Sequence, residues 1–216
     1  MTILNIYIGQ PKPGRYEDAL EMNRASKKLL ERHGAKEQRN LVAAVSGGAY
    51  GSIVNSCELD DIAAWGAFYD AVMADEEILS MMAQLQGANS PYASESVTTA
   101  LEIPLGVKAG TKGRILSARV SAPHPGRHQA AIALGGQLAE LMMSHGARRC
   151  RLFSQQATGA LPDVLVSTTE FDTMAAYGKT VNSLVADPAL QQMLELVRST
   201  DSPVRPITSD IYTEIA

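Results

Sequence analysis

Hydrophobic and polar residues alternate at the start of the chain, and this alternation predicts a β-strand over residues 3–8. Leu4, Ile6 and Ile8 fall on one face of this strand. Asn5 and Tyr7 fall on the other face, so one side of the predicted sheet carries polar side chains from the first strand onwards.

The pattern then changes to the helical period, and a Pro-Gly turn separates the two. Gly34 stands where a C-capping glycine belongs, and Asp60 precedes a second helix as a capping residue. The predicted elements of the first half are a strand at 3–8, a helix at 15–32, strands at 41–45 and 52–59, a helix at 61–73, a short helix after Asp75, and a strand at 97–103. This order is the ferredoxin-like β-α-β-β-α-β pattern.

The second half of the chain repeats the first without a gap, at a spacing of 112 residues. P-K-P-G-R at Pro11 returns as P-H-P-G-R at Pro123, and H-G-A at His33 returns at His145. About 25 of roughly 104 aligned pairs are identical. A period this long is typical of a duplicated domain and not of a solenoid.

We therefore predict an α+β fold made of two ferredoxin-like βαββαβ repeats. A ferredoxin-like sheet carries helices on one face only, so the other face must be covered. The economical arrangement packs the repeats sheet to sheet as a pseudo-twofold α/β barrel. The predicted units are repeat 1 at residues 1–105, a glycine-rich linker at 106–113, and repeat 2 at 114–216. A homodimer of two such chains is also compatible with this pattern.

The repeated motifs resemble those of the dimeric α/β-barrel superfamily. P-G-R precedes the first helix, H-G-A ends it, and E-x-D-x-x-A-A-(W/Y) begins the second helix in both halves. The chain is most similar to NIPSNAP-like and stress-responsive A/B-barrel domains, once per half. The resemblance implies the fold. It leaves the activity open, because the superfamily includes cofactor-free monooxygenases, cyclases, isomerases and haem-binding enzymes.

Composition narrows the classes of partner. With 45 % hydrophobic and 19 % charged residues and a net charge of −4, the chain is globular and has no basic stripe that would bind nucleic acid. No apolar run approaches the roughly 18 residues of a membrane span. Cys57 and Cys150 match neither a disulfide framework nor a metal-binding spacing. We expect a cytoplasmic protein with no metal and no membrane partner.

Positions that differ between the halves are candidates for a specialised site. His124 and His128 occur only in the second half, and histidine titrates near neutral pH, as proton transfer requires. Solvated loop histidines are the alternative. Gly135 and Gly136 interrupt the middle of a predicted helix, which costs up to about 1 kcal/mol each relative to alanine. They allow either close packing against the sheet or room for a ligand.

The first and last strands supply further candidates, because they are neighbours in the ferredoxin-like order. Arg119 replaces Tyr7 in the second half, and we predict that it pairs with Asp210 near Tyr212. The predicted substrate-binding residues are Asn5, Tyr7, Asp210, Tyr212, Gly135 and Gly136, and Arg119 is predicted to act with the catalytic residues. Such a pair either stabilises the fold or orients an anionic or phenolic ligand.

Glutamates and arginines shared by both halves have a structural interpretation. Glu58 and Glu170 precede the second helix of each half, and Arg15 and Arg127 lie in the P-G-R turns. We predict that salt bridges between them hold these turns in place.

The predicted function is a cofactor-free enzyme that acts on a small hydrophobic or aromatic carbonyl metabolite by proton transfer. Isomerase, cyclase and monooxygenase chemistry all fit. His128 is the predicted base and His124 its helper, while Arg119 with Tyr7 or Tyr212 holds an enolate-like oxygen.

Two alternatives remain open. The chain could be a non-catalytic small-molecule-binding or stress-related barrel, in which the asymmetric residues do not gather in a pocket. It could also bind haem, with His128 or His145 as the axial ligand.

Overall fold

The computed structural model describes residues 2–107, 110–158 and 163–215. Each half has the element order β-α-β-β-α-α-β, as the hydrophobic pattern predicts. The strands are β1 (Ile3–Pro11), β2 (Lys36–Val45), β3 (Ile53–Leu59), β4 (Tyr92–Ile103), β5 (Ile115–Pro123), β6 (Arg149–Thr158), β7 (Val164–Phe171) and β8 (Val204–Glu214). The helices are α1 (Tyr16–Arg32), α2 (Ile62–Ala74), α3 (Glu76–Gln86), α4 (His128–Ser144), α5 (Met174–Val185) and α6 (Pro188–Arg198). Among the described helices, none is long and apolar enough to cross a membrane.

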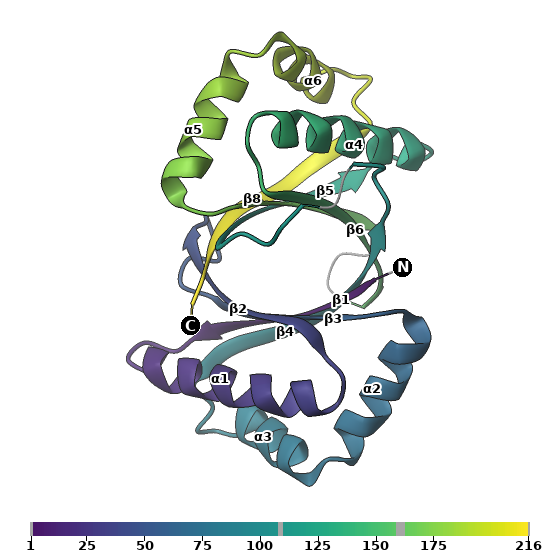
Figure 1. Ribbon diagram of the computed structural model, residues 1–216. Helices are drawn as coiled ribbons and strands as arrows, with labels where there is room; N and C mark the ends of the chain where they lie inside the picture. The colour runs from purple at the N-terminus through teal and green to yellow at the C-terminus, as the bar shows by residue number, and fades with distance from the viewer. Residues whose placement is uncertain (1, 108–109, 159–162, 216) are drawn as a thin grey trace.

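The strands close into one antiparallel barrel in the order β1-β3-β2-β8-β5-β7-β6-β4. Figure 1 shows α1–α3 on one side of this barrel and α4–α6 on the opposite side. The two halves meet edge to edge, through the hydrogen-bonded pairs β2–β8 and β4–β6. A closed barrel leaves no unpaired sheet edge, so each half completes the sheet of the other.

The two seams between the halves have the same strand register. Leu41 of β2 lies opposite Glu214 of β8, and Phe153 of β6 lies opposite Glu102 of β4. Each residue of the first pair is 112 positions from its counterpart in the second. Equal register means that equivalent positions of the two halves lie opposite one another at both seams.

A buried ion cluster crosses one seam. Arg39 donates from Nη1 to Glu170 at 2.9 Å and from Nη2 to Glu214 at 3.2 Å. The side chains of Arg39 and Glu170 are only 4 % and 2 % exposed. Glu170 therefore joins the two halves. The predicted salt bridge from Glu170 to the Arg127 turn is wrong.

The equivalent cluster crosses the other seam. Arg151 donates to the carboxylates of Glu58 and Glu102, which belong to the first half. Arg15, the predicted partner of Glu58, pairs instead with Asp18 one helical turn away. The shared glutamates thus stabilise the contact between the halves, because removing one partner would leave a largely buried charge uncompensated.

Successive residues of β1 face opposite sides of the barrel wall. Ile3 packs in one cluster with Phe68 of α2, and Tyr7 packs against a cluster that contains Ala19 of α1. Odd-numbered residues of β1 therefore face the helices, and even-numbered residues such as Leu4 face the barrel interior. Asn5 and Tyr7, which were predicted to share one face of this strand, both lie on the helix-facing side.

The predicted linker at 106–113 lies between β4 and β5, and residues 108–109 fall outside the described part of the chain. Two of its three glycines, Gly110 and Gly113, are closely packed against backbone. A Cβ atom at Gly110 would lie 1.7 Å from the carbonyl oxygen of Arg148, and one at Gly113 would lie 2.5 Å from that of Phe171. These two positions require glycine because the backbone of Arg148, just before β6, and of Phe171, at the end of β7, occupies the space of a side chain.

Candidate active site

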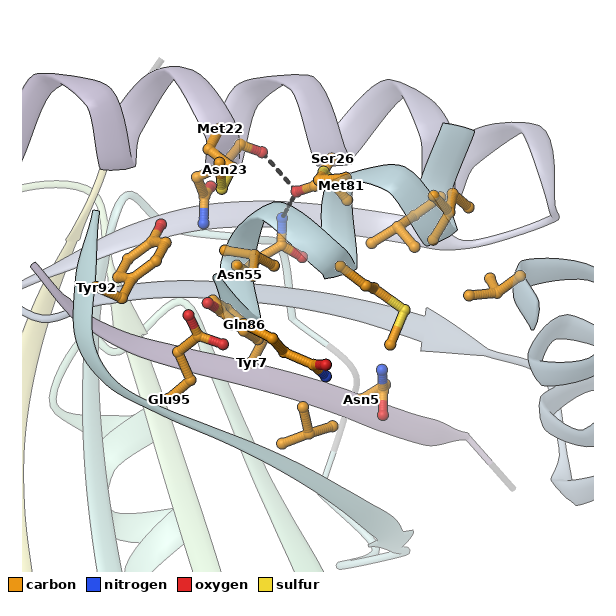
Figure 2. A pocket seen from close by; sticks show the side chains of 16 residues that line it. Asn5, Tyr7, Met22, Asn23, Ser26, Asn55, Met81, Gln86, Tyr92 and Glu95 are labelled. Carbon is orange, nitrogen blue, oxygen red and sulfur yellow. Dashed lines mark hydrogen bonds between the residues drawn. The ribbon is translucent and has the colours of Figure 1, made fainter. Parts of the chain in front are cut away.

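A cavity of about 270 Å³ lies between the helices and the barrel wall of the first half. Figure 2 shows polar side chains from the strands and α1 pointing into a space bordered by methionines. The polar and aromatic lining residues are Asn5, Tyr7, Asn23, Ser26, Asn55, Gln86, Tyr92 and Glu95, and the apolar ones are Met22, Leu30, Val72, Ile78, Met81, Met82, Leu85 and Val97. We call this space the first cavity.

Local structure explains why these residues converge. Asn5 and Tyr7 are two positions apart on β1 and therefore share its helix-facing side. Met22, Asn23 and Ser26 fall on one face of α1, because residues three and four positions apart on a helix are neighbours. The cavity wall is thus mostly apolar and contains a small number of polar groups in fixed positions. This combination is typical of a small-molecule binding site.

Two buried polar atoms of the first cavity have no hydrogen-bond partner among the described residues. They are the hydroxyl of Tyr7 and the Oδ1 atom of Asn23. An unsatisfied buried polar atom costs about 1–3 kcal/mol. A ligand that accepts from Tyr7 and donates to Asn23 would remove both penalties.

The neighbouring amides are held in place. Asn5 accepts from the Thr99 hydroxyl at 3.0 Å, which leaves its amide nitrogen available to a ligand. Asn55 donates to Asn40 at 3.1 Å and to Ser26 at 3.3 Å, and Ser26 donates to the backbone of α1 (Figure 2). These bonds fix the orientation of the polar groups before a ligand arrives.

Burial keeps the tyrosines of the first cavity protonated. Burial raises the pKa of Tyr7 far above its ordinary value, and the charge of the nearby Glu95 carboxylate raises it further. Glu95 approaches the Tyr7 hydroxyl without meeting it in hydrogen-bond geometry. The pKa of Tyr92 is raised by the same two causes, in the same order, and its hydroxyl donates to the Ala19 carbonyl at 2.9 Å. Glu95 itself lies at an exposed position of β4 and borders the cavity. Tyr7 is therefore a neutral donor beside a solvent-connected carboxylate.

A second cavity, of about 390 Å³, lies between the helices and the barrel wall of the second half. It occupies the equivalent place, because Arg119 stands at the position of Tyr7 and Gly135 at that of Asn23, each at the spacing of 112. Its remaining lining is mostly aliphatic. Gly135 is closely packed, since a Cβ atom there would lie 3.1 Å from Leu152.

The structure separates the predicted site residues into several places. Asn5 and Tyr7 line the first cavity, and Arg119 and Gly135 line the second. Gly136 faces away towards the Leu105 carbonyl, 3.9 Å from where a Cβ atom would stand.

The predicted catalytic histidines lie on the surface. His124 and His128 are exposed in the turn before α4 and at its first residue, and neither is a lining residue of the two cavities. Their position agrees with the alternative interpretation, in which both are solvated loop histidines.

The predicted Arg119–Asp210 pair does not form. Ala118 lies opposite Asp210 in the β5–β8 register, so Asp210 shares the barrel-interior face with Ala118, while Arg119 faces the helices. Asp210 accepts instead from the Ser46 hydroxyl at 2.5 Å. Tyr212 lies opposite Leu116 on the interior face, and burial raises its pKa to about 12. Neighbouring residues of a strand face opposite sides of a sheet. A register that differs by one residue from the predicted one therefore places Arg119 and Asp210 on opposite sides of the barrel wall.

The residues present do not fit a haem ligated through the predicted histidines. Both ring nitrogens of His145 are hydrogen-bonded, Nδ1 to Ser183 at 2.9 Å and Nε2 to Asp187 at 2.8 Å. His128 is exposed and outside both cavities. Among the described residues, no group of three or more His, Cys, Asp or Glu side chains could hold a metal ion.

Several residues of the first cavity were not among the predicted site residues. Asn23 lies in the middle of an amphipathic helix and is 3 % exposed, and Asn55 lies in an otherwise apolar strand and is 5 % exposed. A polar residue at a position predicted to be buried was the available signal. Glu95 carried no such signal, because an exposed glutamate is ordinary.

Comparisons with known proteins identify the fold. No family model matches the sequence, and no curated protein matches it. Among solved structures, an anthrone oxidase-like protein superposes with a TM-score of 0.64 and 16 % identity, covering 100 % of this chain and 91 % of that one. A candidate monooxygenase from Fusobacterium nucleatum gives 0.63 and 8 %, with coverage of 100 % and 93 %. A variant of the chlorite dismutase from Candidatus Nitrospira defluvii gives 0.53 and 11 %, with coverage of 100 % and 91 %. At these identities the similarity is one of fold: a ferredoxin-like α+β architecture.

Proposed function

We propose that the chain is a cofactor-independent oxygenase, and that its first cavity oxidises a small aromatic compound with an acidic methylene group beside a carbonyl. The unpartnered Tyr7 hydroxyl carries this proposal. A neutral buried donor is the group that stabilises an enolate oxygen as charge develops on it. Structural neighbours described as anthrone oxidase-like and as a candidate monooxygenase support the same chemistry.

The reaction begins with proton transfer. The Glu95 carboxylate removes a proton from the methylene carbon, and the electron pair moves onto the carbonyl oxygen, which accepts the Tyr7 hydrogen bond. Glu95 replaces His128 as the base, because it borders the cavity and His128 does not. Asn23 accepts from a phenolic hydroxyl of the substrate and fixes its orientation.

Dioxygen is the co-reactant of the oxidation. The enolate transfers electrons to dioxygen, a carbon–oxygen bond forms, and protonated Glu95 returns the proton to give a hydroperoxide. Loss of the second methylene proton then breaks the oxygen–oxygen bond and releases water. One methylene compound and one dioxygen thus give one ketone and one water, with no other oxidant or reductant.

Oxygen consumption with anthrone as substrate tests this function. We expect uptake of one dioxygen per anthrone, with Tyr7→Phe lowering kcat about 10²- to 10³-fold, as loss of an oxyanion donor does. Glu95→Gln lowers it as well. Tyr50→Phe and Glu21→Gln are matched controls at exposed positions and leave the rate unchanged. Equal rates with and without protein, or a Tyr7→Phe variant as active as the wild type, would exclude this mechanism.

We also propose that the halves arose by tandem duplication and are related by a pseudo-twofold axis through the barrel. The equal strand registers and the reciprocal Arg39 and Arg151 clusters support this origin. The NIPSNAP-like relationship, the unit boundaries at 105 and 114, a cytoplasmic location and homodimer formation stay predictions.

A further inference from the structure

The second cavity differs from the first in chemistry as well as in sequence. Its aliphatic lining is formed by Ala131, Leu134, Leu138, Leu152, Leu165, Leu190, Met193, Leu194, Val197, Val204, Pro206 and Ile207. Among the described residues that line it, Arg119 is the one charged side chain, and none is an aspartate or glutamate. Glu95 of the first cavity corresponds to Ile207 here. The electrostatic character of the site is thereby changed from acidic to basic.

Arg119 has no acidic partner among the described residues. Its side chain is exposed on the helix-facing side of β5, and no salt bridge of the described chain includes it. Its neighbour Asp210 is on the other side of the wall. A cation at the edge of an aliphatic cavity, without a protein carboxylate, is available to an anionic ligand.

Two serines flank Arg119 across the sheet. Ser167 of β7 and Ser209 of β8 lie directly opposite Arg119 in the two strand registers, so all three side chains share the helix-facing side. All three line the second cavity. The equivalent row in the first half is Asn55, Tyr7 and Val97. The second half thus presents a guanidinium between two hydroxyls, each of which can donate to a carboxylate oxygen.

We propose that the second cavity binds a medium-chain alkyl monocarboxylate, with the carboxylate on the Ser167–Arg119–Ser209 row and the chain among the aliphatic side chains. The volume of about 390 Å³ lies within the range of small-molecule sites. An aliphatic lining favours an unbranched apolar chain over a polar ligand, and the row selects an acid over an alcohol. This site is separate from the first cavity, and its existence does not depend on the oxygenase proposal.

Calorimetric titration of the full chain with decanoate tests the site, with decanol as the uncharged probe. We expect Arg119→Gln to weaken decanoate binding by about tenfold or more, the effect of losing a charge-assisted bond, and to leave decanol binding unchanged. Arg119→Lys retains part of the affinity. Arg127→Gln, at an exposed arginine outside the cavity, is the matched control and keeps wild-type affinity.

A pair of cavity-filling variants locates the ligand. Met193→Trp narrows the second cavity and abolishes decanoate binding, whereas Met81→Trp, at the equivalent position of the first cavity, leaves it intact. Thermal melts are used to check that each variant is folded. Absence of decanoate binding to the wild type, equal binding by Arg119→Gln, or loss with Met81→Trp and not Met193→Trp would each overturn the proposal. None of these outcomes bears on anthrone oxidation.

Discussion

Nη1 of Arg39 lies 2.9 Å from a carboxylate oxygen of Glu170, and this bond joins the two halves of the barrel inside the protein. Glu170 also accepts from Arg149 at 2.7 Å and from the Gly113 amide at 2.9 Å. One carboxylate therefore organises β2, β6 and the segment before β5. Removing any of these buried partners leaves the Glu170 charge less well compensated in a region of low dielectric constant.

Replacing Arg39 by Met should destabilise the fold strongly. The variant leaves Glu170 with a reduced set of partners, and breaking one side of a buried ion pair costs about 3–5 kcal/mol. Urea unfolding measures this cost. Lys36→Met, which removes the exposed pair with Asp60, should cost less than about 1 kcal/mol. If Arg39→Met lost as little unfolding free energy as Lys36→Met, the ion cluster at this seam would contribute no more stability than an exposed ion pair.

Replacing Tyr7 by Phe should stabilise the free protein by about 1 kcal/mol while it impairs activity. The hydroxyl is buried without a hydrogen-bond partner in the described chain, and its removal ends that penalty. Thermal melting of the ligand-free proteins shows whether Tyr7→Phe is more or less stable than the wild type. A lower melting temperature would mean that the hydroxyl is satisfied in solution, which would weaken its assignment as a free donor.

The two histidine–aspartate pairs should make the stability of the folded protein decrease at acidic pH. Hydrogen bonding to His33 lowers the pKa of Asp75, and hydrogen bonding to His145 lowers that of Asp187. A carboxyl with a lowered pKa in the folded state contributes stability above its unfolded pKa, about 3.9 for aspartate, and loses it as the pH falls through the folded value.

Unfolding free energies measured from pH 7 down to pH 2 test this linkage. Asp75 caps the N-terminus of α3 and Asp187 that of α6. The double variant Asp75→Asn and Asp187→Asn keeps these caps, because asparagine also caps, and should lose less stability than the wild type as the pH falls below about 4. Parallel pH profiles for the two proteins would contradict the assignment.

Both cysteines should be unreactive in the folded protein. Burial raises the pKa of Cys57 to about 12 and that of Cys150 to about 11, so the nucleophilic thiolate is scarce at pH 8. A thiol reagent such as DTNB should modify neither residue in native buffer and both residues in denaturant. Rapid modification of the native protein would show that these core positions open readily.

The hydrophobic pattern was sufficient to predict the order of elements, because burial sets the period of each segment directly. It also placed Asn5 and Tyr7 on a common face, which the first cavity uses. The partners of Glu58 and the separation of Arg119 from Asp210 could not be predicted in this way. The partners of Glu58 depend on how the two halves join, and the separation of Arg119 from Asp210 depends on the register between β5 and β8 within the second half. The period within a single strand carries no information on its register with another strand.

The polar contrast between Tyr7 and Arg119 has a consequence for how this barrel can evolve. In a barrel assembled from two identical chains, any substitution enters both cavities at once, so both must keep the same ligand. Here the equivalent positions lie on one continuous polypeptide and mutate independently. The chain can therefore carry the Tyr7 hydroxyl in one cavity and the Arg119 guanidinium in the other, and selection can act on each position without changing its counterpart.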